Sequence, residues 1–323
     1  MKYLIKTSKL SILTIILLIA SQSSAQPDIV WQRFYGGGDN QSFYASVMMD
    51  NGDLAFTGNS HNSSVYFVMT NAGGEILTEN RYELEDDFSR WGNALTPTDE
   101  NGFVIGGCWN HRDNRFGAMR INARGEVLWD RIYSENDGSV CMAVIGASGD
   151  VFYLAGWEPT EDAGDQGFIV KVSGNGDVIW RRHYGGEGDQ FDRLHDIKAA
   201  EFGYILAGES GPGGQNNVDF WVLRISEDGE ELSSDLYGND FYETVRALER
   251  SPDGGWVVAG FWASQLPSWN AAILKLDENL REEWFQHYQD RDHTLRLYDI
   301  TPARGGGFAT VGWDGTGGEA SGY

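Results

Sequence analysis

Five tryptophans in this chain have the residue type and spacing that could perform recognition chemistry. Four of them directly follow an apolar strand-like stretch, about fifty residues or twice that distance apart, and the fifth stands shortly after one of these. They are Trp109, Trp157, Trp262, Trp269 and Trp313. The flat face of an indole can stack on a sugar ring while nearby Asp and Asn side chains hydrogen-bond the hydroxyls. We therefore predict these tryptophans as carbohydrate-binding residues, with wedges between packed sheets as the structural alternative.

Aspartates supply a second set of candidate ligands, since acids recur at about the same period as the tryptophans. The four considered as calcium ligands are Asp39, Asp137, Asp189 and Asp240. Ca²⁺ requires several oxygen atoms that converge at one point, and none of these stretches has EF-hand spacing. Basic residues also recur at this period, at Arg120, Lys171, Arg224 and Lys275. Structural ion pairs between the two sets are the favoured interpretation, so we expect no cofactor, and Ca²⁺ stays open.

Catalytic motifs of known spacing do not occur in the sequence. The six histidines are scattered and show neither His-x-His nor His-Glu-x-x-His spacing, which argues against a metal centre. The sequence also lacks a Gly-x-Ser-x-Gly elbow and a phosphate-binding glycine-rich loop. Two carboxylates from different parts of the chain could still form a pair that cleaves glycosides. A secreted polysaccharide hydrolase or lyase is therefore the alternative to a non-enzymatic binding module, and no catalytic residue is assigned.

Two ladders of single residues reveal the elements that must position these side chains. Tyrosines recur at intervals of 47 to 53 residues, at Tyr35, Tyr82, Tyr133, Tyr184, Tyr237 and Tyr288. Glycines recur at intervals of 49 to 52 residues, at Gly58, Gly107, Gly156, Gly208, Gly260 and Gly312. Two independent ladders with one period indicate an array of equivalent structural units.

The third repeat shows the composition of one unit most clearly. Its strand signals are Val140–Ile145, Val151–Trp157, Phe168–Val172 and Val178–Tyr184, with a polar loop over Glu158–Gln166. The first and last pairs of stretches are joined by short turns rich in Gly, Asn and Asp, as tight hairpins require. Each unit is therefore predicted to hold four antiparallel strands.

Four short strands per fifty residues, without a helical period, are typical of propeller blades. The sequence predicts an all-β propeller of four-stranded antiparallel blades, six in number, with seven blades or an open fragment as alternatives. The sixth blade has strand signals at Leu295–Thr301 and Gly307–Trp313. We expect the N-terminal strand Ile29–Tyr35 to complete this blade, because closure removes exposed sheet edges. The loops after each second strand and those between blades then share one face, which is the predicted ligand face.

Several local motifs resemble a known group of proteins. The Gly-Tyr-Ile-Leu-Ala-Gly of Gly203–Gly208, the Gly-x-x-x-Trp of Gly176–Trp180 and the Tyr-Gly-Gly of Tyr184–Gly186 resemble secreted bacterial β-propeller repeats of about fifty residues. The Gly-x-x-x-Trp element is also distantly similar to quinoprotein-like propellers. The resemblance covers about residues 29–313. It implies an exported propeller and supplies no catalytic residue.

The first 25 residues have the features of a signal peptide. A lysine-containing start precedes the apolar stretch Leu10–Ala20, and the small residues Ser23–Ala25 mark a cleavage site. Residues 26–323 are expected to form one propeller domain, and truncation at its C-terminus is an open alternative. Its repeats are predicted at about 36–82, 83–133, 134–184, 185–237, 238–288 and 289–323, the last together with 29–35.

Composition limits the partners and the compartment. The chain has 48 acidic and 24 basic residues, and removal of the leader with its three lysines changes the formal net charge from −24 to −27. This charge disfavours nucleic acid and anionic membranes as partners, and no segment after the leader resembles a membrane span. We expect a monomer, secreted or at the cell surface with the periplasm as an alternative, that binds a carbohydrate or an extracellular protein. A structural array inside a larger surface protein is the third functional alternative.

Two cysteines, Cys108 and Cys141, are the only ones in the chain. Such a low number excludes a disulfide scaffold. Buried free thiols are the expected state of both, and a single disulfide between them is the alternative.

Overall fold

The computed structural model describes residues 31–37, 40–60, 64–83, 89–109, 114–188, 190–212, 218–238, 241–263, 269–288, 294–303, 306–316 and 319–322. The chain separates into two compact units, Met1–Arg33 and Phe34–Tyr323. The architecture given below is that of the second unit.

Every regular element among the described residues is a strand, and the strands form six antiparallel sheets in chain order. The first sheet contains β1 (Gln41–Met48), β2 (Leu54–Ser60), β3 (Ser64–Thr70) and β4 (Ile76–Tyr82). The second contains β5 (Arg90–Pro97), β6 (Phe103–Trp109), β7 (Arg115–Ile121) and β8 (Val127–Ile132). The third contains β9 (Val140–Ala147), β10 (Val151–Thr160), β11 (Gly164–Ser173) and β12 (Val178–Tyr184), and the short β13 (Gln190–Phe191) pairs with β11 in parallel.

The remaining sheets follow the same order. The fourth contains β14 (Arg193–Ala199), β15 (Tyr204–Ser210), β16 (Asp219–Ile225) and β17 (Glu231–Tyr237). The fifth contains β18 (Tyr242–Arg250), β19 (Trp256–Ala263), β20 (Asn270–Leu276) and β21 (Glu282–Tyr288). The sixth contains β22 (Thr294–Pro302), β23 (Phe308–Thr316) and β24 (Glu319–Gly322). Six consecutive sheets with the predicted strand order confirm the all-β architecture.

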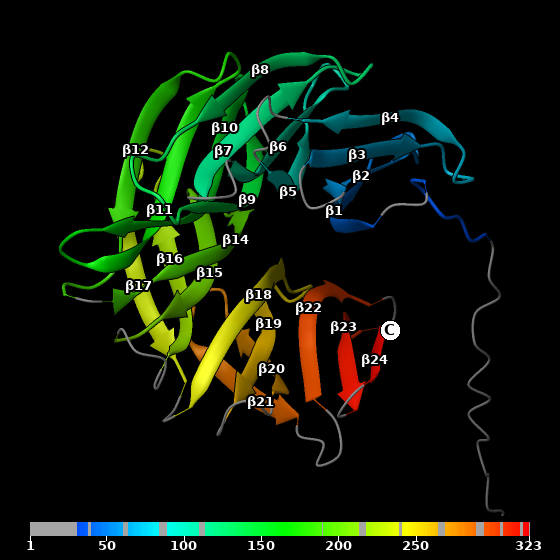
Figure 1. The fold of residues 1–323 in the computed structure, drawn as a ribbon. Coiled ribbons are helices and arrows are strands. Elements are labelled where there is room, and N and C mark those ends of the chain that lie inside the picture. The colour runs from blue at the N-terminus through cyan, green and yellow to red at the C-terminus, as the bar shows by residue number, and fades with distance from the viewer. Residues whose placement is uncertain are drawn as a thin grey trace, which may run out of the picture. The chain divides into compact units, whose positions relative to one another are not determined.

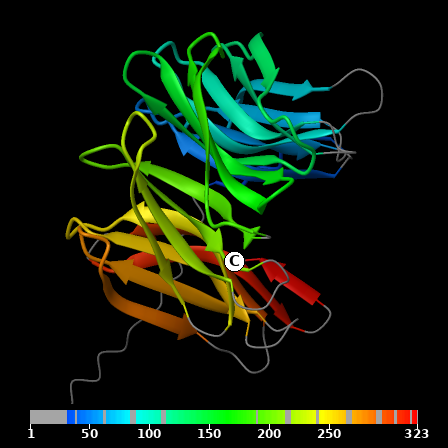
Figure 2. The same ribbon diagram turned by 90° about the vertical axis from the view of Figure 1, so that its left-hand side faces the viewer.

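The first strand of each sheet contacts the first strand of the next, from β1 through β5, β9, β14 and β18 to β22. The sheets therefore stand side by side around an axis that their first strands line, and their fourth strands lie outermost (Figure 1, Figure 2). Burial is greatest in the middle strands: the second strands β6 and β19 are buried along their whole length, whereas most residues of the outer strand β8 are exposed.

The apolar core lies between neighbouring sheets. In one example, Phe116 of the second sheet packs edge-on against Phe168 of the third with ring centroids 5.1 Å apart, and both side chains are fully buried. Burial of one such side chain stabilises the fold by about 1.5–3 kcal/mol. No sheet can bury both of its own faces, so each depends on its neighbours.

The tyrosine ladder forms a repeated hydrogen bond between sheets. Among the described residues, five of the six hydroxyls donate to a backbone carbonyl in the turn between the third and fourth strands of the next sheet. The pairs are Tyr35 to Gly74 (3.0 Å), Tyr82 to Gly125 (2.8 Å), Tyr133 to Gly176 (3.0 Å), Tyr184 to Gly229 (2.7 Å) and Tyr237 to Leu280. A fold requirement that is met once per unit therefore explains the period of this ladder.

The sixth sheet has three strands among the described residues. The N-terminal strand predicted to complete it falls partly outside them, and residues 31–35 carry no strand assignment in the part that is described. Tyr35 nevertheless makes its hydrogen bond to Gly74. It thus occupies the position, relative to the first sheet, that the end of a preceding fourth strand would occupy.

The third sheet differs from prediction in one segment. The polar stretch Glu158–Gln166, expected to be a loop, instead extends both strands of a hairpin, and the β10–β11 pairing continues out to Thr160 opposite Gly164. Additional pairing of Gly164 and Asp165 with β13 stabilises this extension. The prediction failed because polarity alone does not distinguish an exposed hairpin from a loop.

The ion pairs expected between loop acids and the basic residues of the third strands do not form at Arg120 and Lys275, which pair with other acids. Arg120 pairs with Asp150 at 2.8 Å, and Lys275 pairs with Asp253 at 2.9 Å and Glu283 at 2.8 Å. These acids belong to tight turns or to a fourth strand. The two cysteines are buried free thiols, as predicted.

Candidate functional site

The first strand of every sheet carries a β-bulge at the same place. One residue of that strand has no partner on the second strand, so two residues lie opposite one. The unpaired residues are Tyr44, Asn93, Met142, His195, Arg246 and Tyr298. A bulge bends the strand and redirects its side chain, and bulges occur preferentially next to functional sites.

The glycine ladder of the sequence is the consequence of these bulges. In each sheet the residue before the bulge pairs with a ladder glycine, as Phe43 does with Gly58. A Cβ atom on Gly58 would lie 1.8 Å from the Ser42 carbonyl oxygen, and one on Gly156 would lie 1.9 Å from that of Val140. Only glycine permits this approach of two backbones. The glycines are recognisable in the sequence by their period, whereas the bulged residues, which stand 13 or 14 positions before them, vary in type and show no such signal.

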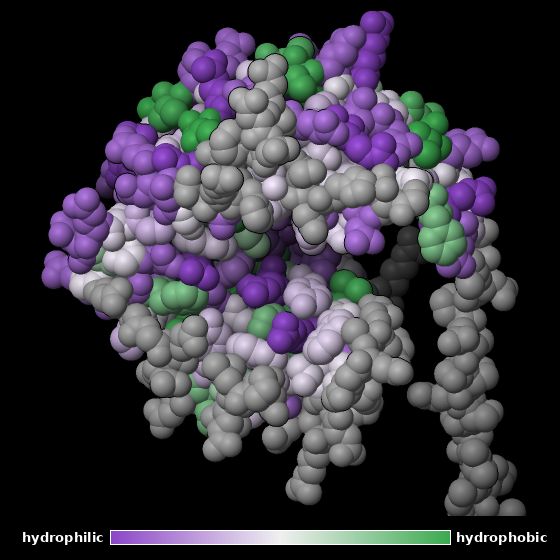
Figure 3. Space-filling model, viewed as in Figure 1, coloured by the Kyte–Doolittle hydropathy of each residue, from purple (hydrophilic) through white to green (hydrophobic). Residues whose placement is uncertain are grey.

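The six bulged side chains line one cavity on the axis of the sheets. Its two parts, pockets of about 820 Å³ and 650 Å³, share all six of these residues and Phe43 in their walls. The face of the unit seen in Figure 3 is hollowed near its centre, and hydrophilic side chains lie in the hollow. The wall is built mainly by first strands, whereas the predicted ligand face was built by loops, many of which fall outside the described residues.

The five predicted tryptophans separate into different environments. Trp157 and Trp269 line the larger part of the cavity. Trp109 and Trp262 are buried, with 1% and 7% of their surface exposed. Trp313 is half-buried, with the Arg296 guanidinium 5.4 Å from its ring, and is not among the residues that line the cavity.

Trp109 and Trp262 fit the structural alternative. The Trp109 indole N–H donates to Asp130 at 2.6 Å, and Asp130 in turn pairs with Arg90. Trp262 packs against Phe241 and His287 with ring centroids 4.9 and 4.8 Å away.

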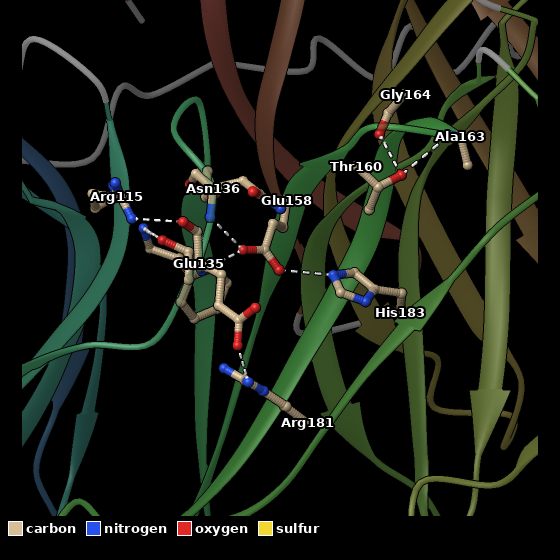
Figure 4. A network of polar contacts seen from close by, with 12 residues as sticks. Arg115, Glu135, Asn136, Glu158, Thr160, Ala163, Gly164, Arg181 and His183 are labelled. Atoms are coloured by element: carbon tan, nitrogen blue, oxygen red, sulfur yellow. Dashed lines mark hydrogen bonds and ion pairs between the residues drawn. The ribbon is translucent and has the colours of Figure 1, made fainter.

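Trp157 is held at the cavity by the loop that precedes β9. Its indole N–H donates to the Gly138 carbonyl at 3.1 Å. The next residue, Glu158, is buried and accepts the backbone N–H groups of Glu135 at 2.6 Å and Asn136 at 3.0 Å (Figure 4). Glu158 also lies 2.8 Å from Nε2 of His183. This network fixes the loop and the strand end that together orient the Trp157 ring.

The Glu158 carboxyl is ionised in this network. Burial by itself would raise its pKa, but the hydrogen bonds from His183, Asn136 and Glu135 outweigh burial and lower the pKa below its usual value. The negative charge is thus stabilised by fixed donors and is not available to a ligand.

Trp269 lies on the cavity wall and contacts residues of the fifth and sixth sheets. Its ring meets Tyr242 edge-on at 5.5 Å and Phe261 edge-on at 5.0 Å. The Arg296 guanidinium lies 5.1 Å from its centroid. Packing from three sides gives Trp269 a defined orientation.

The charged groups of the larger part of the cavity are mostly arginines. Arg193 pairs with Asp165 at 2.5 Å and covers Trp157 at 4.7 Å. Arg246 and Arg296 also line this part. The acid there, Glu209, is buried and lies 3.3 Å from His195. Burial lowers the pKa of His195, although the charge of Glu209 opposes this, so the imidazole is neutral at pH 7.

The smaller part of the cavity has a different character. Asp196, Lys198 and Asp299 line it, one residue and three residues beyond the bulges. Lys198 lies 3.7 Å from Asp196, whose pKa is raised by burial against the opposing effect of that lysine. The cavity is therefore cationic in one part and mixed in the other.

Only one of the four candidate calcium ligands lies among the described residues. Asp137 pairs with Arg115 at 2.5 Å, whereas Asp39, Asp189 and Asp240 lie outside the described residues. No group of three or more His, Cys, Asp or Glu side chains able to hold a metal occurs in the part of the chain that the structure describes.

Comparisons with known proteins bear on the fold. No protein-family model and no curated protein matches the sequence. Among solved structures, the chain is similar to the WD40 domain of Neurospora crassa Pan2, with a TM-score of 0.50 and 12% identity over 83% of this chain and 71% of that one. The chain is a β-propeller.

Two further solved structures show weaker likeness to this propeller. The subtype N10 neuraminidase-like protein of A/little yellow-shouldered bat/Guatemala has a TM-score of 0.49 and 10% identity, over 88% of this chain and 96% of that one. BBS1N, in complex with ARL6DN, has a TM-score of 0.46 and 10% identity, over 83% and 74%. At such identities the likeness concerns the fold alone. Within the described residues, no helix is long and apolar enough to cross a membrane.

Proposed function

We propose that this propeller is a non-enzymatic binding module that holds a carbohydrate in its central cavity. The observation that carries the proposal is that Trp157 and Trp269 line the same cavity as the ring of bulged side chains. The signal peptide predicted at residues 1–25 supports a place outside the cytoplasm, in the medium or at the cell surface. An extracellular protein is the alternative partner.

The size and composition of the cavity support a small ligand. About 820 Å³ falls within the range of roughly 300–1,000 Å³ typical of ligand pockets. Aromatic walls with a few oriented polar groups are the usual composition of such sites. Asn93, His195 and the hydroxyls of Tyr44 and Tyr298 supply hydrogen-bonding groups, and a sugar needs both kinds of surface.

The variation around the ring argues that these positions serve recognition. The ladder glycines and tyrosines repeat because each unit has the same backbone requirement. The bulged position instead carries five residue types in six sheets. The fold does not constrain the residue type at this position, although the position faces a common cavity in every sheet. Its side chains can therefore be adapted to a ligand that binds in one orientation.

Binding is tested with a glycan array followed by calorimetric titration of the ligands found. We expect Trp157→Ala and Trp269→Ala to weaken binding about tenfold or more each, since loss of about 1.4 kcal/mol of stacking corresponds to that factor. Trp284→Ala is the matched control, because Trp284 is 40% exposed on the outer strand β21. Unchanged binding in both cavity variants would refute the proposal.

A polysaccharide hydrolase is the second candidate function. Asp196 and Asp299 both line the smaller part of the cavity, and burial raises the pKa of Asp196. Glycosidases use one carboxyl that is protonated and one that is ionised. Release of reducing sugar from a polysaccharide panel, abolished by Asp196→Asn, would establish catalysis, and saturable binding without release would leave the binding module.

A further inference from the structure

We propose that the saccharide held in this cavity is anionic and that Arg246 and Arg296 recognise its carboxylate or sulfate. The inference rests on the proposed function and specifies the chemical class of the ligand. The shared chemistry is an oxyanion attached to a sugar ring.

The first argument is the charge balance of the cavity. The described residues place no carboxylate within 4.0 Å of either Arg246 or Arg296, whereas Arg193 has Asp165 at 2.5 Å. The chain as a whole has 48 acidic and 24 basic residues. Arg246 and Arg296 lie on the wall of one cavity, and neither has a described carboxylate within that distance, so an anion from outside can pair with both.

The second argument is that both guanidinium groups are held in place by neutral neighbours. Arg246 Nη1 donates to the Val245 carbonyl at 2.9 Å and to Thr244 Oγ1 at 3.3 Å. It also lies 3.3 Å from Nδ1 of His195. These contacts fix the side chain without neutralising it.

Arg296 is held by aromatic faces instead. Its guanidinium lies 5.1 Å from the ring centroid of Trp269 and 5.3 Å from that of Phe261. Its Nε is buried without a hydrogen-bond partner among the described residues. An arginine held against aromatic rings presents planar donors in a fixed orientation, which suits bidentate binding of a carboxylate or sulfate.

Glu209 is the one acidic residue among the described residues that line the larger part of the cavity, and it does not cancel the charge of the two arginines. Glu209 is almost completely buried, and its Oε1 lies 3.3 Å from Nε2 of His195. Arg193 is neutralised by Asp165. In the larger part of the cavity, Arg246 and Arg296 together with Glu209 therefore leave one net positive charge, whereas the smaller part also contains Asp196 and Asp299 beside Lys198.

The arrangement also explains why a sugar rather than a free anion fits. Trp157 and Trp269 supply apolar faces in the same part of the cavity as the two arginines. A small inorganic anion would leave these faces in contact with water. A sugar ring that carries an oxyanion can cover an indole and reach a guanidinium at once.

Calorimetric titration of the intact chain with matched probes tests the inference. The probes are an oligogalacturonate, its methyl-esterified form, which has the same rings without the charge, and a sulfated galacto-oligosaccharide. We expect at least one of the two charged probes to bind at least tenfold more tightly than the ester. Binding should weaken with added NaCl, because partly exposed charges are screened. The preference between carboxylate and sulfate identifies the source of the oxyanion.

The variants Arg246→Gln and Arg296→Gln test whether the preference for the charged probe comes from these two arginines. Each variant should lower the affinity for the preferred charged probe about 10- to 100-fold, because hydrogen bonds to charged groups are stronger than those between neutral groups. The weak affinity for the methyl ester should stay unchanged. Arg131→Gln, at an exposed arginine on the outer strand β8, is the control and should change nothing. Arg296→Lys keeps the charge but not the planar donor pair, and should give an intermediate loss. Circular dichroism confirms that each variant is folded.

The outcomes separate the two proposals. Equal or tighter binding of the ester, with loss of all binding in Trp157→Ala, would refute anion recognition and keep the carbohydrate-binding module. Charged-probe binding that neither arginine variant affects would also refute it. Absence of binding to every saccharide on the array would overturn both.

Discussion

The substitution Gly156→Ala tests whether the ladder glycines exist to permit the bulges. A Cβ atom at this position would lie 1.9 Å from the Val140 carbonyl oxygen and 3.0 Å from its carbonyl carbon. The two backbones would have to separate by about 1 Å, which costs roughly 1–3 kcal/mol of strain in a packed structure. Loss of one backbone hydrogen bond between β9 and β10 would add about 1 kcal/mol to this cost. We expect the free energy of unfolding to fall by about 2–4 kcal/mol.

Urea unfolding followed by tryptophan fluorescence measures this loss, and Gly146→Ala is the matched control. Gly146 lies in β9 of the same sheet, and a Cβ atom there would have Phe152 at 3.7 Å and the Pro97 carbonyl at 3.8 Å, which are ordinary contacts. The control should stay within about 0.5 kcal/mol of wild type. If Gly156→Ala unfolds at the same urea concentration as Gly146→Ala, the explanation of the glycine ladder is wrong.

Three further predictions concern the scaffold. Tyr133→Phe removes the buried hydrogen bond to Gly176 and should lower the free energy of unfolding by about 1 kcal/mol, with no change in the spectrum of the folded state; an unchanged urea midpoint would contradict the role of the tyrosine ladder. Because the pKa of Glu158 is lowered in the folded state, its contribution to stability is present above the unfolded pKa of about 4.3 and is lost as pH falls through the lower folded value. Glu158→Gln should therefore lower stability at pH 7 and reduce its slope with pH below about 4.5, as measured by urea unfolding across pH, and an unaltered slope would refute the assignment. Burial raises the pKa of the Cys108 thiol to about 12, so iodoacetamide at pH 8 should label neither cysteine until the chain unfolds, and mass spectrometry that finds fast native labelling would refute this.

Much of the fold could be predicted because the requirements that define it repeat within every unit. The tyrosine of each fourth strand must reach a turn of the next sheet, and the glycine of each second strand must admit a carbonyl. Both requirements are backbone geometry, so they select one residue type at one spacing. The order and pairing of strands within each sheet followed from these positions and the turns between them.

The division of the tryptophans was missed because they were treated as one set, although their distances from the ladder glycines differ. Trp109 stands two residues after Gly107, whereas Trp157 stands one residue after Gly156. Successive side chains of a strand point to opposite faces of the sheet, so the two indoles lie on opposite faces. The Trp109 indole donates to Asp130, and the Trp157 indole donates to the Gly138 carbonyl in the loop and remains at the cavity. The spacing separates the two tryptophans but does not show which face meets the cavity, because the cavity wall comes from other strands.

The same comparison shows why the ring of bulged residues is open to functional variation. The bulge is specified by the glycine on the second strand, which removes the steric barrier, and not by the bulged residue itself. The fold is therefore indifferent to whether that residue is the asparagine of the second sheet or the arginine of the fifth. Backbone geometry and ligand chemistry are assigned to different strands, so a cavity can acquire Arg246 without loss of the hairpin that presents it. In a chain built this way, the residue 13 or 14 positions before each ladder glycine is where specificity for a ligand can be changed at least cost to stability.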